Sequence, residues 1–539
     1  LTIEVYDVAA NYQGMQTGWY AKEIKDRFNI ELNIVAPQVS GDAASLYQTR
    51  CASGDLGDII ILDNADMQDC VDVGLIADIS EDLPNYENLM KYDEQISLFN
   101  DSINEVIGTE GVYAIPAEMN SNGPTEYKED TVAVMPRLEW DHYVEVGAPE
   151  MKNLDDLLDT LKKIQDAYPT NEAGDKTYAL SLWPDWDGTS IENVNQLTKW
   201  YGQEVNGSIL LGTDNSITPL TDKDGAYYKM LKFLYKANQM GLVDPDSATQ
   251  DWNAACDKMR QGRVHLFWYN WQYGFWNSPA KGEARQNYRG IPLEDLNIYQ
   301  ASDTYYGDGR AWAVGSNVSD EDKARILEFM DWLCSPEGLT MQHIGQEGFI
   351  YTVNDDGTYT LTDAGMTRFA DDPQVPEELG GGSWTDGNNQ INQWLVASIE
   401  MNPETGETFG SDYWASFLEK NNTATNKEWS EKFGSETEVS YLEENGMLNI
   451  VPNVNLVLPI DTTDIALIRS QCGDQIKATS WQAIFASDDA EFDQMWDDMC
   501  VTLEGLGWDQ LVEFDTDKYQ AVVDALSLIH ISEPTRHAQ

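Results

Sequence analysis

Hydrophobic positions near the start of the chain alternate between strand-like and helix-like spacing. Apolar and polar residues alternate in Thr2–Val8, whereas the apolar positions of Gln16–Phe28 recur on one helix face. In chain order, the predicted elements are a strand at Thr2–Val8, a helix at Gln16–Phe28, a strand at Ile30–Val35, a helix at Ala43–Ala52 and a strand at Ile59–Leu62. The last strand is apolar throughout, which is typical of a parallel strand buried on both faces. This order predicts an open parallel sheet with helices on both sides.

Helix boundaries further along the chain are marked by capping residues. Asn153 is the predicted N-cap of a helix that runs to about Ala167. Ser319 and Asp322 form a capping box for a helix that ends near Cys334. Further predictions are a short strand at Gly111–Pro116, a strand at Tyr178–Leu182, a helix at Gly225–Met240, a hairpin turn at Asn354–Gly357, and loops at Gly380–Gly382 and Asn421–Glu438.

Aromatic residues gather in two places. The segment Leu266–Trp276 reads LFWYNWQYGFW, and Trp183 and Trp186 lie in a turn with Pro, Asp and Gly after the strand at Tyr178–Leu182. Core packing is the alternative interpretation for each single ring. However, so many rings with almost no aliphatic residue make an unusual core strand. Flat apolar rings beside Asp, Asn and Gln suit a pyranose, which offers one apolar face and a rim of hydroxyls.

Length and charge limit the classes of function. A chain of 539 residues is too long for one hydrophobic core, because cores stop growing at roughly 250–300 residues, so we expect two domains. The chain has 93 acidic and 33 basic residues, a net charge of −60, which repels nucleic-acid phosphates and anionic lipids. Its apolar runs are far shorter than the ~20 residues of a membrane span. We therefore expect a soluble globular protein that binds no nucleic acid.

Sequence motifs for catalysis and metal binding are absent. The six cysteines form no CxxC pair, although disulfides between distant cysteines stay possible. His142, His265 and His343 form no HExxH motif, and the chain has no GxSxG or GxxxxGK segment. We therefore expect no catalytic residue, no metal and no cofactor.

An ordered set of segments resembles one protein family. These segments are CASGDLGDIII (51–61), GLIADISEDL (74–83), GVYAIP (111–116), GLVDPDSATQ (241–250), QGRVHLFWYNW (261–271), FMDWLCSPEGL (329–339), QEGFIYTVNDDGTYTLTDAG (346–365) and EFDQMWDDMCVTLEGLG (491–507). They resemble extracellular solute-binding proteins of ABC transporters, of the maltose-binding type, in particular the long lipoproteins of Gram-positive gut bacteria. The likeness covers nearly all of Leu1–Ala525. The family usually has proline where this chain has Gly57, a difference that affects one turn.

The resemblance implies an α/β, periplasmic-binding-protein-like clamp of type II, which captures a carbohydrate for an importer. Each lobe would be an open, mostly parallel sheet flanked by helices, with the ligand in the cleft between lobes and hinge closure on binding. One lobe would comprise residues 1–117 and about 301–346, and the other about 118–300 and 347–525. The implied partners are a carbohydrate, which we expect to be an oligosaccharide, and ABC permease subunits. The protein would be a monomer tethered to the cell surface through an N-terminal lipid anchor that lies outside this chain.

The resemblance also implies ligand contacts from two groups of residues. In the first lobe these are Asn11, Tyr12, Gln13, Asp63, Asn64 and Asp66, with Glu118 and Asn120 after the GVYAIP segment. The opposite lobe would contribute Trp183, Trp186 and Trp271, and we add Tyr273 and Trp276 from the same aromatic segment. With no arginine cluster beside that segment, the sequence does not favour an acidic sugar.

Two alternative functions stay open at this stage. A glycoside hydrolase shares aromatic sugar platforms, and the same clamp captures peptides or other non-sugar ligands. With 93 carboxylates, acidic pairs at the spacing of glycosidases arise by chance, so they do not discriminate.

The C-terminal segment Leu526–Arg536 reads LSLIHISEPTR. It matches the translation of a transposase adapter used in sequencing libraries, which indicates a metagenomic read. We therefore treat 526–539 as an artefact and expect its deletion to change neither stability nor binding.

Overall fold

The chain folds into two compact units. The structure is a computed structural model that describes residues 1–39, 43–388, 390–391, 394–456 and 458–532. Unit 1 comprises Leu1–Lys128, Ser302–Lys420 and Pro452–Ile460, and unit 2 comprises Glu129–Ala301, Asn421–Val451 and Asp461–Gln539. The α/β class predicted from the sequence is confirmed. No helix in the described ranges is both long enough and apolar enough to cross a membrane.

Unit 1 is built on a mixed six-stranded sheet with the order β2-β3-β1-β4-β13-β5. The strands β3, β1 and β4 are parallel, whereas β2 and β13 run antiparallel to their neighbours. The strands are β1 (Thr2–Asp7), β2 (Gly14–Met15), β3 (Glu31–Val35), β4 (Ile59–Asp63), β5 (Ala114–Pro116) and β13 (Arg310–Val314), and a separate hairpin pairs β14 (Tyr351–Val353) with β15 (Tyr359–Leu361).

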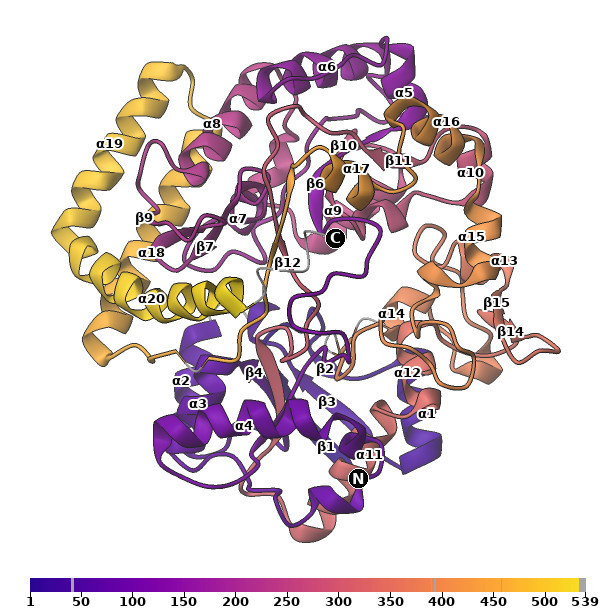
Figure 1. The fold of residues 1–539 in the computed structure, drawn as a ribbon, viewed down its shortest axis with the longest axis vertical. Helices are drawn as coiled ribbons and strands as arrows, with labels where there is room; N and C mark the ends of the chain where they lie inside the picture. The colour runs from indigo at the N-terminus through magenta and orange to yellow at the C-terminus, as the bar shows by residue number, and fades with distance from the viewer. Residues whose placement is uncertain (40–42, 389, 392–393, 457, 533–539) are drawn as a thin grey trace. The chain divides into compact units, whose positions relative to one another are not determined.

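Helices cover both faces of this sheet, as the sequence predicts. Alternate residues of β4 enter two different cores: Ile59 and Ile61 pack with Trp19 of α1, whereas Ile60 and Leu62 pack with Phe99 of α4. Figure 1 shows α2, α3 and α4 on one side of the strands and α1, α11 and α12 on the other. The helices of unit 1 are α1 (Gly18–Phe28), α2 (Ala43–Ser53), α3 (Asn64–Asp72), α4 (Asp93–Ile107), α11 (Asp320–Leu333), α12 (Pro336–His343), α13 (Asp363–Met366), α14 (Trp384–Asn388) and α15 (Ala415–Asn421, whose last residue belongs to unit 2).

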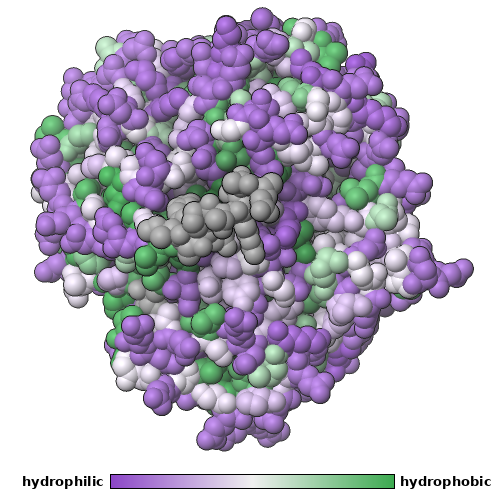
Figure 2. Space-filling view, in the orientation of Figure 1, coloured by the Kyte–Doolittle hydropathy of each residue, from purple (hydrophilic) through white to green (hydrophobic). Residues whose placement is uncertain are grey.

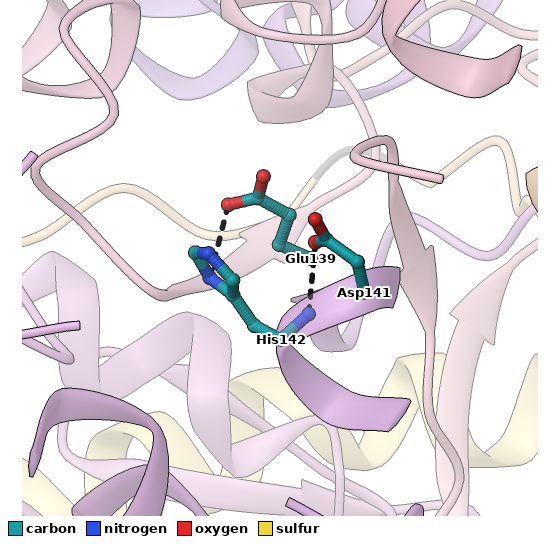
Figure 3. A group of neighbouring side chains, drawn as sticks. All are labelled: Glu139, Asp141 and His142. Atoms are coloured by element: carbon teal, nitrogen blue, oxygen red, sulfur yellow. Dashed lines mark hydrogen bonds and ion pairs between the residues drawn. The ribbon is translucent and has the colours of Figure 1, made fainter. Parts of the chain in front are cut away.

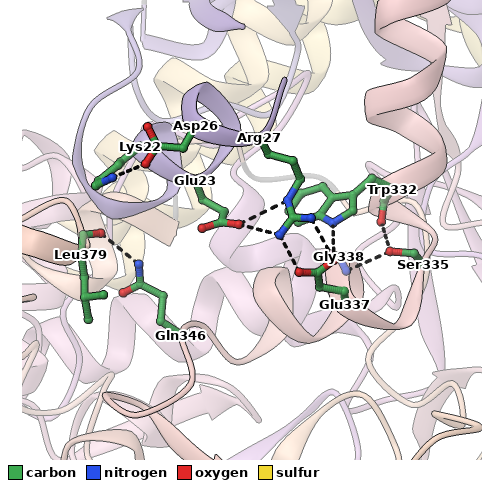
Figure 4. A network of polar contacts seen from close by, with 10 residues as sticks. All are labelled: Lys22, Glu23, Asp26, Arg27, Trp332, Ser335, Glu337, Gly338, Gln346 and Leu379. Atoms are coloured by element: carbon green, nitrogen blue, oxygen red, sulfur yellow. Dashed lines mark hydrogen bonds and ion pairs between the residues drawn. The ribbon is translucent and has the colours of Figure 1, made fainter. Parts of the chain in front are cut away.

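The segment SPEG, part of the family likeness, caps α12 and joins it to α1 (Figure 4). The Ser335 hydroxyl accepts a hydrogen bond from the Gly338 N–H at 3.1 Å. A Cβ atom on Gly338 would lie 1.8 Å from the Trp332 carbonyl oxygen, so only glycine fits there. Glu337 pairs with Arg27 of α1, whose guanidinium carbon lies 5.0 Å from the Trp332 ring centroid. The local chemistry of these residues therefore fixes the junction between α1, α11 and α12.

Unit 2 contains three small sheets packed against helices. β10 (Leu266–Tyr269) and β11 (Tyr288–Gly290) flank β6 (Val134–Glu139) and run antiparallel to it, so this sheet differs from the mostly parallel one that we expected. The predicted strand at Tyr178–Leu182 is not a regular strand. It forms only two isolated parallel bridges, one between Tyr178 and Val264 and one between Leu180 and Val243. The other strands are β7 (Gln203–Asn206), β8 (Ile209–Gly212), β9 (Ile217–Pro219), β12 (Ile298–Ala301) and β16 (Leu448–Val451).

The helices of unit 2 are α5 (Trp140–Glu145), α6 (Leu154–Ala167), α7 (Glu192–Thr198), α8 (Ala226–Gln239), α9 (Trp252–Arg260), α10 (Pro279–Glu283), α16 (Ala424–Phe433), α17 (Glu438–Glu444), α18 (Thr463–Ile484), α19 (Asp489–Leu506) and α20 (Trp508–Ser532). The cap of α6 is confirmed, because the Asn153 side chain accepts hydrogen bonds from the Asp155 and Asp156 N–H groups. The prediction of a loop over Asn421–Glu438 is wrong. Most of this segment is α16, which buries Trp429 completely.

The division of the chain also differs from the one that we expected. Residues 347–420 pack within unit 1, although we had assigned them to the second lobe. Ile350, Leu361, Trp384 and Trp414 share a buried core with Val5 of β1. Hydrophobic spacing identifies which side chains are buried, but it does not identify the sheet that covers them.

The C-terminal segment partly continues the fold. Leu526–Ser532 extends α20, and Leu526 is only 3% exposed, so its deletion would remove a buried side chain. The rest of the suspected adapter, residues 533–539, lies outside the described residues.

The buried Arg137 of β6 provides a test of how unit 2 is held together. Arg137 is 0% exposed and pairs with Glu438 of α17 at 2.8 Å. Arg137→Met leaves the Glu438 carboxylate buried without its partner, so we expect unfolding free energy to fall by about 3–5 kcal/mol. Urea unfolding followed by tryptophan fluorescence measures this loss.

The matched control removes an ion pair at the surface. Arg285 and Glu428 lie 2.7 Å apart, with side chains 43% and 35% exposed. Arg285→Gln should therefore cost less than ~1 kcal/mol. Equal losses in the two variants would contradict a structural role for the buried pair.

Candidate functional site

In unit 1, the predicted ligand-binding residues after β1 and β4 occupy one edge of the sheet. β1 and β4 are parallel neighbours, so their carboxyl ends meet there. Asp63 ends β4 and is exposed, and Asn64 and Asp66 lie in the first turn of α3. Arg310 of β13 is the ladder partner of Asp63 and forms an ion pair with Asp308. This edge therefore presents several carboxyl groups around one guanidinium.

The loop after β1 is held by its own polar side chains. The side-chain oxygen of Asn11 accepts a hydrogen bond from the Gln38 side chain at 2.7 Å. The Gln13 side chain accepts one from the Ala36 N–H at 2.9 Å, and the Tyr12 hydroxyl donates one to the Met15 carbonyl at 2.6 Å. These contacts fix the loop against the segment after β3 and leave further donors and acceptors of the same side chains for a ligand.

Glu118 and Asn120 differ in exposure. Glu118 is half-buried and has a left-handed backbone conformation, with a φ angle of 58°. Asn120 is 1% exposed, and its amide donates to the Thr304 hydroxyl at 3.2 Å while its carbonyl oxygen accepts from the Asn122 N–H. The Asn120 side chain therefore shapes the loop, in contrast to the ligand contact that we expected.

In unit 2, aromatic rings form one continuous cluster, which we call the aromatic platform. Its members come from three separate segments of the chain, and each ring centroid lies within 6.4 Å of another: Trp183, Trp186, Trp252, Trp268, Tyr269, Trp271 and Phe275. Trp268 and Tyr269 end β10, and Trp252 begins α9. The antiparallel pairing of β10 with β6 fixes the direction of the strand that carries the platform.

Trp271 is the exposed ring of the platform. It is 40% exposed and lies two residues after the end of β10. Its ring stacks on Tyr269 with centroids 4.6 Å apart and planes inclined by 24°, and Trp252 meets it edge-on at 5.3 Å. A large flat apolar surface is thus held in one orientation with part of it open to solvent.

The other predicted tryptophans of the platform differ in their environment. Trp186 is half-buried and lies 5.9 Å from Trp271. Trp183 is 0% exposed and stacks on the equally buried Trp268 at 5.6 Å, so it supports the platform from within the core. We had expected Trp183 to contact the ligand. Its burial depends on packing against a strand far along the chain, which sequence spacing does not reveal.

Tyr273 and Trp276 are half-buried, but Trp276 is held by other contacts. Its indole N–H donates to the Gln286 carbonyl at 2.9 Å, and the Lys281 ammonium lies 3.3 Å from its ring centroid. Among the described residues, no ring contact links Trp276 to the platform.

Sequence reasoning missed Trp252. It is 7% exposed and touches Trp183, Trp186, Trp271 and Phe275, which makes it the centre of the platform. Its backbone N–H donates to the Asp185 carboxylate at 2.7 Å, and this bond ties α9 to the turn that carries Trp186. The available signal was a lone tryptophan directly after the helix cap Asp251.

The comparison of the sequence with protein families adds to this geometry. The profile of the bacterial extracellular solute-binding proteins matches residues 19–376, about two thirds of the chain. The chain belongs to this family. Ten of the thirteen predicted contact residues lie within this match, and Asn11, Tyr12 and Gln13 lie before it.

Solved structures of solute-binding proteins show the same fold. A Streptococcus pneumoniae ABC-transporter substrate-binding protein, FusA, in complex with fructo-nystose is 17% identical, with a TM-score of 0.59 over 97% of this chain and 100% of that chain. The alginate-binding protein AlgQ2 is 14% identical, with a TM-score of 0.60 over 96% and 98%. An HMO-binding solute-binding protein from Bifidobacterium longum infantis is 16% identical, with a TM-score of 0.55 over 97% and 99%. No curated protein sequence matches the chain.

The acidic turn beside Trp186 has an unusual carboxyl group. Asp187 accepts hydrogen bonds from the Trp481 indole at 2.7 Å and from the Glu192 N–H at 2.9 Å, so it anchors this turn to α18 and α7. Burial raises the pKa of Asp187 to about 7, although both hydrogen bonds act in the opposite direction.

This raised pKa predicts a pH dependence of stability. The folded protein binds the Asp187 proton more tightly than the unfolded chain, where the pKa is about 3.9. The stabilisation is complete below about pH 4 and is lost as pH rises through about 7. Asp187→Asn removes this titration, so between these limits the unfolding free energy of the wild type should fall relative to that of the variant. Urea unfolding at about pH 4.5 and about pH 7.5 measures the change. A constant difference between the two proteins would show that Asp187 does not titrate in this window.

Proposed function

We propose that the protein is the substrate-binding component of an ABC importer and captures an extracellular carbohydrate, specifically an oligosaccharide. The single observation that carries this proposal is the geometry of Trp271. Its ring is 40% exposed and is held by Tyr269 and Trp252. A fixed apolar face of this size suits the apolar face of a pyranose ring, and longer glycans offer several such faces.

Polar groups complete the proposed recognition of the sugar. The carboxyl and amide side chains of Asn11, Gln13, Asp63, Asn64 and Asp66 lie at one edge of the unit 1 sheet and suit sugar hydroxyls. Tyr12 and Glu118 belong to the same proposed set. In unit 2, Trp186 and Tyr273 would extend the surface of Trp271, whereas Trp183, Trp276 and Asn120 would act as supporting residues. Hinge closure on binding, as the resemblance implies, is part of the proposal.

Family membership supports the other elements of the proposal. Extracellular solute-binding proteins deliver their ligand to a partner in the membrane, here ABC permease subunits. The neighbours with the same fold include proteins for fructo-nystose, alginate and HMO, so carbohydrate is the ligand class that we propose. We also propose that the protein is a monomer tethered by a lipid anchor, and that it binds its ligand without a reaction.

A ligand screen by thermal shift tests the proposed ligand class. The full chain is melted with fructo-oligosaccharides, milk oligosaccharides, alginate oligosaccharides and mixed peptides. A ligand that binds only the folded protein raises stability by RT ln(1 + [L]/Kd), which is ~2.7 kcal/mol at 100 times Kd. We expect a shift with at least one glycan and none with peptides. Stabilisation by peptides alone, or release of reducing ends during incubation, would contradict the proposal.

The stabilising glycan from this screen then tests Trp271. Trp271→Ala removes the exposed stacking face, so we expect affinity to fall roughly tenfold to a hundredfold, equivalent to ~1.5–3 kcal/mol. Isothermal titration calorimetry measures the affinity. Trp271→Phe is the matched variant, because it keeps an aromatic face and should lose much less.

Stability measurements separate binding from folding. Trp268→Ala removes a fully buried ring of the same platform and should destabilise the protein by about 3–5 kcal/mol, clearly more than Trp271→Ala. Unchanged glycan affinity in Trp271→Ala would refute the platform as the binding surface.

A further inference from the structure

Three side chains at the junction of β6 and α5 gather around one point (Figure 3). Glu139 is the last residue of β6, and Asp141 and His142 lie in the first turn of α5. A ligand atom from each lies within 4.8 Å of those of the other two. This cluster is separate from the aromatic platform, and the proposed function uses none of its residues.

The His142 ring is held in place by its neighbours, and one of its nitrogens faces Glu139. It stacks on Tyr168 with ring centroids 3.6 Å apart and meets His265 edge-on at 5.6 Å. Its Nδ1 atom is shielded from solvent and lies 3.1 Å from a Glu139 carboxylate oxygen. Within the described part of the chain, this nitrogen makes no hydrogen bond of acceptable geometry. The contact with Glu139 is therefore poorly aligned, although the two atoms are close.

Each of the two carboxyl groups has an oxygen within 4.8 Å of the ligand atoms of the other two residues. Glu139 is 5% exposed, and its carboxylate contacts His142. One Asp141 oxygen accepts a hydrogen bond from the His142 N–H at 2.8 Å, as Figure 3 shows. Two carboxylates held this close repel each other, and a cation between them would offset that repulsion.

We propose that Glu139, Asp141 and His142 bind a Zn²⁺ ion in unit 2. Three atoms that lie within 4.8 Å of one another can be no farther than about 2.8 Å from a common centre. Zn²⁺ bonds to nitrogen and carboxylate oxygen are roughly 2.0–2.2 Å long, so small side-chain adjustments suffice. One imidazole with two carboxylates suits Zn²⁺, whereas Ca²⁺ prefers six to eight oxygen ligands. A bound water would complete the coordination. The ion would tie the end of β6 to the start of α5.

Zinc titration of the full chain after treatment with a chelator tests this site. Excess Mg²⁺ is present throughout, because a chain with a net charge of −60 binds divalent cations loosely at many carboxylates. We expect one tight equivalent of Zn²⁺ by calorimetry, a rise in melting temperature, and visible absorption bands with Co²⁺ as a substitute ion. Ca²⁺ should not compete at the same concentration.

Four variants locate the binding. Glu139→Gln, Asp141→Asn and His142→Gln each remove one ligand, and each should weaken Zn²⁺ binding at least about tenfold. Glu172→Gln is the matched control, because Glu172 is exposed and adds negative charge near Glu139 without belonging to the cluster. The Glu172→Gln variant should still bind one Zn²⁺ ion tightly. Asp141→Asn keeps an acceptor for the His142 N–H, so it tests the site even where the other variants fold poorly.

The outcomes are distinct. Loss of the tight equivalent and of the Co²⁺ bands in the ligand variants alone supports the site. Equal binding in the wild type and all four variants would show that surface carboxylates hold the metal, and absence of a tight equivalent in the wild type would refute the site. Neither result bears on carbohydrate binding, which is measured separately.

Discussion

The architecture of unit 2 depends on a charge buried in its central strand. The guanidinium of Arg137 is shielded completely, and a buried charge is tolerated only when it is paired and hydrogen-bonded. It donates to the Trp268 carbonyl of β10 and to Glu438 of α17, whose other oxygen accepts the Gly290 N–H of β11. All three strands of this sheet and a helix from a distant part of the chain therefore meet at one ion pair.

This arrangement explains why both candidate sites of unit 2 lie where they do. The bond from Arg137 to Trp268 holds the strand that ends two residues before Trp271. Two residues after Arg137, the same strand ends at Glu139, and α5 begins with Trp140. Side chains two apart on a strand share a face. The strand thus sets the positions of the exposed aromatic ring at one end and of the polar cluster at the other.

Sequence periodicity predicted helices and strands well where the residues of one short segment are enough to define the element. The N-terminal strands and helices and the cap at Asn153 need only local spacing and one hydrogen-bonding side chain. Helix α16 has few apolar residues, so its period is weak, and it is stabilised by the buried Trp429, whose indole donates to the Gly290 carbonyl of β11. The assignment of residues 347–420 differs from the observed units for a related reason, since it depends on which sheet covers an apolar face.

The site was predictable to a smaller extent, because exposure is a tertiary property. The sequence identifies an aromatic segment, but it does not distinguish Trp271, which is 40% exposed, from Trp183 and Trp268, which are fully buried. The buried rings still matter for the proposed binding surface. Tyr269 and Trp252 hold Trp271 in one orientation before any ligand arrives. Ordering a flexible side chain costs ~0.5–1.5 kcal/mol on binding, and a ring that is already ordered avoids most of that cost. In the proposed carbohydrate site, the core of unit 2 would therefore contribute to ligand affinity through rings that the ligand does not touch.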